Sequence, residues 1–226
     1  MLKKSFLFVC IGLLVFSCKP EVLDNMRLNV KGELRDGNGN PIPNIPVMTK
    51  ASLYELGNDL SDEQGRFDFV SLTSDYRHFE IYINSSGWIN STETNYNSDF
   101  STVTYKFHES AFEQTYVLST VTLKKKALLN LKIQKTSTEN DTLYWSLEYN
   151  SPICNFRIGY EGINDQDCYP VAVISDRLGI SHLDYEDQFQ SVQNSEAVFG
   201  YRINSGEFQT VNIELNQDIT KYVFEY

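Results

Sequence analysis

Apolar and polar residues alternate along most of this chain after residue 26. Apolar side chains recur at every second position in segments such as 28–34 and 79–83, and Gly, Asn and Asp residues suited to turns separate these segments. A period of two is the repeat of a β-strand with one buried face. Helical periodicity is hard to find over more than two turns. The pattern therefore predicts an all-β fold.

The predicted strands fall into two groups on either side of the run Lys124-Lys125-Lys126. About seven strand patterns follow this run within roughly 100 residues, which is typical of a β-sandwich. One of them is the alternating segment that begins at Cys154. We expect two consecutive β-sandwich domains, 27–125 and 126–226, with the lysine run as an exposed strand end or domain junction.

The N-terminus has the pattern of an export signal. Two lysines precede an apolar run from Phe6 to Phe16, which is too short for a bilayer core that needs about 20 apolar residues and fits a secretory signal. Val15-Phe16-Ser17-Cys18 resembles the lipobox of bacterial lipoproteins. The resemblance implies that the signal peptide 1–17 is removed, that Cys18 carries the acyl chains (palmitate among them), and that 18–26 is a tether. The alternative is a plain signal peptide.

The residues after Cys18 bear on location. Lys19 stands where an aspartate would resemble an inner-membrane retention signal, so we expect an outer-membrane lipoprotein, on the periplasmic face or the cell surface. Glu21 and Asp24 resemble the acidic export signals of Bacteroidetes-type surface lipoproteins.

Two motifs in the first half carry a family resemblance. Val30 to Asp36 with Gly39 to Val47, and then Ser61-Asp62-Glu-Gln-Gly65-Arg-Phe67, resemble the carboxypeptidase regulatory-like domain. The segment 116–123 is similar to the last strand of that family. The resemblance implies a transthyretin-like, Ig-like β-sandwich in a cell-envelope protein. It implies no reaction, because the family's module is an accessory domain.

Charge and histidine placement exclude several classes of function. The formal net charge is −11, which argues against nucleic acid and anionic lipid surfaces as partners. The three histidines lie far apart without a C-x-x-C motif, so we expect no metal and no cofactor. No Gly-x-Ser-x-Gly motif is present, and we expect no enzyme. The hydrolase alternative rests on His182, which lies near Asp176 and Asp184 in sequence.

Cys154 and Cys168 are the cysteines left after the signal peptide and Cys18. In an oxidising compartment such a pair tends to form a disulfide. A hairpin turn around Asn164 would hold the two sulfurs roughly 20 Å apart at about 3.3 Å per residue. A turn centred on 160–162 would place them opposite each other. We expect the bond and leave the register open.

The polar stretch 85–105 supplies candidate binding residues: Trp88, Tyr96 and Phe100. They could contact a glycan or protein partner, or pack the loop onto its own sandwich. Asp141-Thr142-Leu143 resembles an O-glycosylation acceptor at Thr142, with an ordinary turn as the alternative. The sequence thus favours a lipid-anchored binding or assembly module for an envelope protein or glycan. The alternatives are an envelope hydrolase with a site in the C-terminal half and a purely structural spacer.

Overall fold

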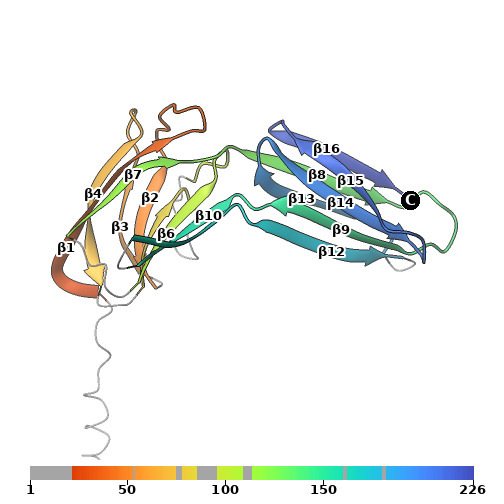
Figure 1. Cartoon of the computed structure of the whole chain (residues 1–226), viewed down its shortest axis with the longest axis horizontal. Helices are drawn as coiled ribbons and strands as arrows, with labels where there is room; N and C mark the ends of the chain where they lie inside the picture. Colours follow the sequence, from red (N-terminus) through yellow and green to blue (C-terminus); the bar gives the residue numbers. More distant parts are fainter. Residues whose placement is uncertain are drawn as a thin grey trace, which may run out of the picture.

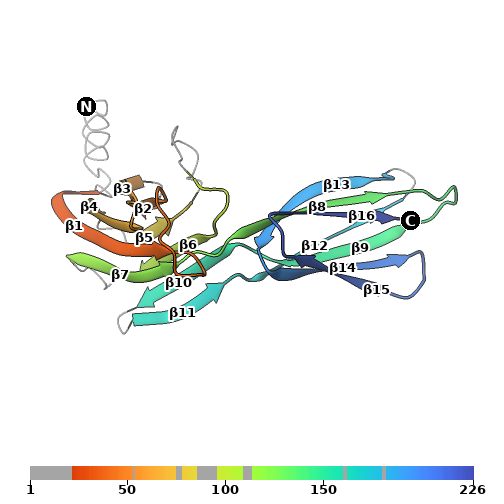
Figure 2. The ribbon, with the colours of Figure 1, turned by 90° about the horizontal axis from the view of Figure 1, so that it is seen from above.

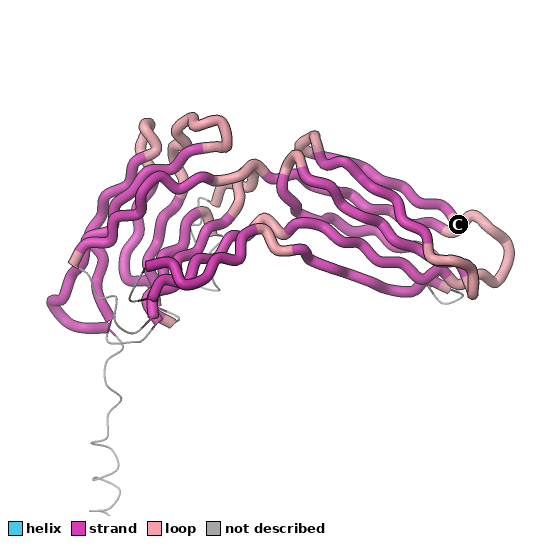
Figure 3. The backbone as a smooth tube through the Cα atoms, viewed as in Figure 1, coloured by secondary structure: helices cyan, strands magenta, loops and turns pink. Residues whose placement is uncertain are grey.

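The computed structural model describes residues 22–52, 54–74, 78–85, 96–108, 114–159, 162–179 and 182–226. All elements within these ranges are β-strands (Figure 3), so the predicted all-β class is confirmed. Within these ranges, the chain has no helix that is long and apolar enough to cross a membrane. The predicted signal peptide 1–17 and Cys18 lie outside the described residues. Residues 22–26, expected in the tether, instead begin β1, where Val22 pairs with Ser74.

The first sandwich consists of two facing sheets (Figure 1). One sheet has the order β4-β1-β7, with bounds Arg66–Ser74, Val22–Arg35 and Thr115–Thr122. The other has the order β11-β10-β6-β5-β2-β3, with bounds Gly162–Cys168, Ile153–Gly159, Thr102–His108, His78–Ile83, Pro46–Ala51 and Tyr54–Leu60. Alternate side chains of both sheets point inward, and Val30, Leu34, Ile81 and Ile83 are fully buried between them.

The second sandwich has a four-stranded sheet and a three-stranded sheet. The first has the order β12-β9-β14-β15, with bounds Val171–Leu178, Leu143–Asn150, Ser195–Ile203 and Gln209–Leu215. The second has the order β13-β8-β16, with bounds Tyr185–Val192, Lys126–Gln134 and Ile219–Glu225. Phe199 is fully buried between them. Its ring centroid lies 6.2 Å from that of Trp145 and 5.0 Å from that of Phe224, so Trp145 is a core residue.

The hairpin β10–β11 belongs to a different sheet from the one expected. Its residues 153–168 were assigned to the second sandwich by their sequence position, but β10 pairs in parallel with β6 of the first sandwich. Cys154 is 3% exposed in the first core, and the Phe156 ring stacks on Tyr105 at 4.8 Å. Figure 2 shows this hairpin beside β6, away from β9 and β12. The chain therefore passes between the sandwiches after β7, after β9 and after β11.

The two sandwiches lie end to end (Figure 1). β1 begins in the first sandwich, and the C-terminus lies at the end of the second that faces away from the first. Each sandwich has its own cluster of buried apolar residues. Whether 27–125 and 126–226 fold independently stays a prediction. The hairpin 153–168 matters for it, because these residues belong to the second range but pair with β6 of the first sandwich.

Candidate functional site

Two aromatic residues of the predicted binding loop pack against the chain itself. Trp88 lies outside the described residues. Phe100 packs on the first core and its backbone bridges to Lys125. The Tyr96 ring lies 4.4 Å from the Nζ atom of Lys126. The Tyr96 ring and the Phe100 backbone thus join the loop to the start of β8, and a binding role for the loop stays a prediction.

Asn84 fixes the end of this loop, although no sequence signal had singled it out. Its side chain is fully buried, and its backbone has a φ of 53°, a conformation that asparagine tolerates better than most residues. The Nδ2 group donates hydrogen bonds to the carbonyls of Asn97 at 2.9 Å and Phe100 at 2.7 Å. The Oδ1 atom accepts from the Asn97 N–H at 2.9 Å. One buried amide therefore holds residues 97–100 in place.

Lys126 is the most unusual ionisable group of the junction. It is 7% exposed, whereas Lys124 and Lys125 are exposed, because the Tyr96 ring covers it and its Nζ atom contacts the Tyr96 hydroxyl. The Gln190 Oε1 atom lies 3.4 Å from the same nitrogen. Burial lowers the pKa of Lys126 to about 8, and the nearby Asp99 carboxylate partly opposes the shift.

A cavity of about 310 Å³ lies beside Lys126 at the junction. Its walls come from the loop before β6 and from three strands of the second sandwich: Ser98, Asp99, Lys126, Leu128, Gln190 and Ile219. The Lys126 backbone N–H donates to the Asp99 carbonyl at 2.8 Å. The junction is thus held by backbone and side-chain contacts from both sandwiches.

We expect Lys126 to make stability increase with pH. Above pH 8 the amine is neutral in the folded chain, while the unfolded chain still binds a proton up to about pH 10.4. Stability therefore rises wherever the unfolded state holds more protons. Between pH 8 and 9.5 the gain is about 1.5 kcal/mol, and Lys126→Met should abolish it.

Urea unfolding at several pH values between 8 and 9.5 measures this slope, and the difference between wild type and Lys126→Met isolates it, because both proteins have the same tyrosines. Lys125→Met, which removes an exposed neighbouring lysine, should leave the slope unchanged. An unaltered slope in Lys126→Met would show that the amine is charged in the folded protein.

The motif residues of the first sandwich have turn-forming roles. Asp36 Oδ1 accepts hydrogen bonds from the N–H groups of Asn38 and Asn40, both at 2.8 Å. Asp62 Oδ1 does the same for the N–H groups of Gln64 and Arg66, at 2.9 and 2.8 Å. The Asn40 side-chain amide, which donates to Asp36 Oδ2 at 3.0 Å, and then the backbone bonds lower the pKa of Asp36. The Arg66 N–H is the main cause of the lowered pKa of Asp62. The motif carboxylates therefore shape two turns.

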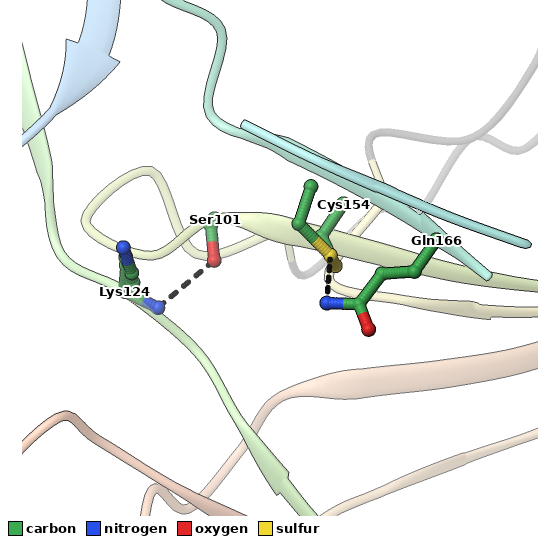
Figure 4. The surroundings of a disulfide bond; sticks show 5 residues. Ser101, Lys124, Cys154 and Gln166 are labelled. Carbon is green, nitrogen blue, oxygen red and sulfur yellow. Dashed lines mark hydrogen bonds between the residues drawn. A yellow bond between two sulfur atoms is a disulfide. The ribbon is translucent and has the colours of Figure 1, made fainter. Parts of the chain in front are cut away.

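The structure contains the predicted disulfide. Cys154 and Cys168 are direct cross-strand partners and are bonded to each other (Figure 4). Of the two registers left open, the chain adopts the one that closes between Gly159 and Gly162. Gln166 Nε2 donates to Cys168 Sγ at 3.4 Å. The bond therefore braces the hairpin that connects the second half of the chain to the first sandwich.

The remaining candidates lie at the far end of the second sandwich. Thr142 is half-buried. Its N–H donates to Asn204 Oδ1 at 2.9 Å, and its carbonyl accepts from the Asn204 N–H at 2.8 Å. These two bonds hold Thr142 in a turn before β9. Its glycosylation stays a prediction. His182 is exposed and its backbone pairs with Gly179. Within the described ranges, no three His, Cys, Asp or Glu residues form a possible metal site.

Comparisons with known proteins add little to this description. No family model matches the sequence, and no curated protein matches it, so the coarser β-sandwich assignment stands without a named family. The tip fimbrial protein Mfa3 from Porphyromonas gingivalis is 8% identical, with 83% of this chain and 81% of that one covered and a TM-score of 0.31. A putative adhesin from Bacteroides ovatus is 10% identical, with 91% and 90% covered and a TM-score of 0.30.

The Bacillus anthracis TIE protein is 11% identical, with a TM-score of 0.30. The match covers 88% of this chain but only 34% of that protein's length. Because all three TM-scores are low, these likenesses say nothing about the function of this protein.

Proposed function

We propose that this protein is a lipid-anchored, non-catalytic module of the cell envelope that binds or assembles with a protein or glycan partner. The end-to-end arrangement of the two sandwiches carries the proposal (Figure 1). β1 begins in the first sandwich, only a few residues after Cys18. An anchor at Cys18 would hold the first sandwich beside the outer membrane and present the second sandwich away from it.

The junction supports a role as a stiff presenting module. The chain passes between the sandwiches after β7, β9 and β11, and the passage after β9 ends in the disulfide-braced hairpin, which belongs to the six-stranded sheet of the first sandwich. The Tyr96–Lys126 contact adds a tie across the junction. A connection of this kind limits hinge motion more than a single flexible linker would. A purely structural spacer would need the same stiffness, so only a binding surface distinguishes a binding module from a spacer.

The finer family assignment belongs to the same proposal. The turns capped by Asp36 and Asp62 are the ones whose motifs resemble the carboxypeptidase regulatory-like domain. Their position within a sandwich supports that assignment for the first half of the chain.

The anchor is tested by changing the two cysteines of the N-terminal segment separately. Cys18→Ala should abolish acylation and leave the precursor uncleaved at residue 18, because the thiol is the attachment point. Cys10→Ala, within the signal peptide, should leave both unchanged. Metabolic labelling with a tagged fatty acid, combined with outer-membrane fractionation, measures these outcomes. Equal label in wild type and Cys18→Ala would contradict the anchor.

A further inference from the structure

A row of cationic and aromatic side chains crosses the outer face of the sheet β12-β9-β14-β15. Arg177 pairs with Tyr144, and Tyr144 pairs with Arg202 on the next strand. Tyr201 pairs with Gln209, so the following position opposite Arg202 is Phe208. The row joins three segments that are far apart in the sequence, because Arg202 and Phe208 belong to the same hairpin. We call Arg177, Tyr144, Arg202 and Phe208 the distal row, because they lie at the end of the second sandwich where β9 begins and β14 ends.

The side chains of the distal row are open to solvent. Tyr144 is 37% exposed and Phe208 is 59% exposed, and both arginines are exposed. By the alternation of the strands, the row lies on the face opposite to the buried Leu143 and Trp145. In the described part of the chain, Tyr144 and Phe208 thus place two exposed rings on one sheet face, and apolar groups gathered in this way can mark an interaction site.

Gly200 leaves room for the Phe208 ring to lie against the sheet. An added Cβ at Gly200 would lie 2.4 Å from the Cζ atom of Phe208 and 2.9 Å from the Ser146 hydroxyl. Only a glycine therefore leaves room for the ring to lie over β14. The ring is kept on the sheet face while more than half of it stays exposed.

The two guanidinium groups have no carboxylate partner in the part of the chain that the structure describes. Arg202 lies over the Tyr144 ring, with its Cζ atom 4.8 Å from the ring centroid. Glu148 is on the same face of β9 but four residues from Tyr144, about 13 Å along the strand. The screening length in physiological salt is about 8 Å. Asp176 Oδ1 accepts from the Arg177 N–H at 2.7 Å, but Asp176 pairs with the buried Trp145 and so belongs to the opposite face of the sheet. The face that carries the row is therefore locally cationic in a chain whose net charge is −11.

We propose that the distal row binds an acidic polysaccharide whose pyranose rings carry carboxylates, such as a polyuronate. Guanidinium groups bind carboxylates in a bidentate geometry, and exposed aromatic rings can cover the apolar C–H faces of sugar rings. The Phe208 ring lies back over β14, so the row's two guanidinium groups and two rings extend over about two strand spacings of about 4.8 Å each, or about 10 Å across the strands, which suits an elongated ligand. This inference rests on the proposed binding function and names the class of partner.

The direction of the row separates a glycan from a peptide. A peptide that adds as a strand needs the free N–H and C=O groups of a sheet edge. The row instead runs across the strands, and its central members lie on β9 and β14, which are paired on both sides. Binding there depends on side chains alone, which suits a ligand with rings and carboxylates.

The test uses the full mature chain in detergent at 0.15 M salt, with three probes: oligogalacturonate, neutral dextran and polyglutamate. We expect oligogalacturonate to bind at least tenfold more tightly than either of the others. The double variant Arg177→Gln/Arg202→Gln should weaken its binding at least tenfold. The matched control Lys132→Gln/Lys221→Gln removes two exposed cations from the opposite sheet and should change binding less than twofold. Calorimetric titration measures each affinity, and an unchanged melting temperature verifies folding.

Three results would overturn the proposal. They are no oligogalacturonate binding by wild type, equal losses in the two double variants, and polyglutamate binding as tight as that of oligogalacturonate, which would indicate an acidic peptide. Failure here is distinguishable from failure of the proposed function, because Cys18 labelling and outer-membrane fractionation do not depend on the distal row.

Discussion

Replacing residues 153–168 with a short Gly-Ser linker is expected to unfold the first sandwich, although these residues lie in the second half of the chain. The change removes β10 and β11, exposes the edge of β6, and takes Cys154 and Phe156 out of the first core. Phe156 is partly buried and Cys154 is buried, and their loss together with the whole β6–β10 ladder should cost at least as much as the loss of one fully buried phenylalanine, about 3–5 kcal/mol. A whole domain is typically stable by about 5–15 kcal/mol, so losing the hairpin should exceed what the first sandwich can tolerate.

Hydrogen exchange of amides in β1, β5 and β6 measures this effect. The same linker inserted after Gly206, in the exposed turn between β14 and β15, should leave that protection intact. A fragment that ends at residue 125 should behave like the hairpin deletion. Full protection of β5 and β6 in the deletion variant would show that the first sandwich folds without the hairpin, as a division at residue 125 implies.

Phe199→Ala is expected to lower the free energy of unfolding of the second sandwich by about 3–5 kcal/mol. Phe199 is fully buried, and its ring lies among those of Trp145, Tyr222 and Phe224 at centroid distances of 6.2, 5.5 and 5.0 Å. Alanine would leave a cavity between two sheets that are held apart by their other side chains, so the surroundings can close only partly.

Urea unfolding followed by circular dichroism and by tryptophan fluorescence measures the change. Val223→Ala provides the control, because Val223 lies on β16 of the same sandwich but is 54% exposed, and surface changes of this kind shift stability by less than about 0.5 kcal/mol. Similar losses in the two variants would place Phe199 outside the rigid core.

The protein has three parts with different roles along its length. The first sandwich, which includes the hairpin 153–168, forms the base. The junction at Lys126 joins the base to the second sandwich. The distal row lies at the opposite end from the start of β1. Under the proposed anchor at Cys18, the cationic end would be the part that reaches furthest from the membrane.

The sequence by itself determined the class of fold and, for most strands, which alternate residues face the core. The alternation of Leu28, Val30 and Leu34, and of Leu143, Trp145 and Leu147, is local information, because each strand repeats in two residues and needs one buried face. All six of these side chains are buried. The disulfide was also predictable from the cysteine count and the export signal. Only the register, Cys154 opposite Cys168, needed the folded hairpin.

The tertiary structure alone decided which sheet each strand joins and which surface residues meet. An alternating strand reads the same in any sheet, so nothing local in 153–159 indicates parallel pairing with β6, some fifty residues earlier. Lys126 is buried because the Tyr96 ring, thirty positions away, covers it. Arg177, Tyr144, Arg202 and Phe208 form one row only because the strand order β12-β9-β14-β15 brings them side by side. Strand order depends on long-range pairing, and the period of two in the sequence contains no information about it.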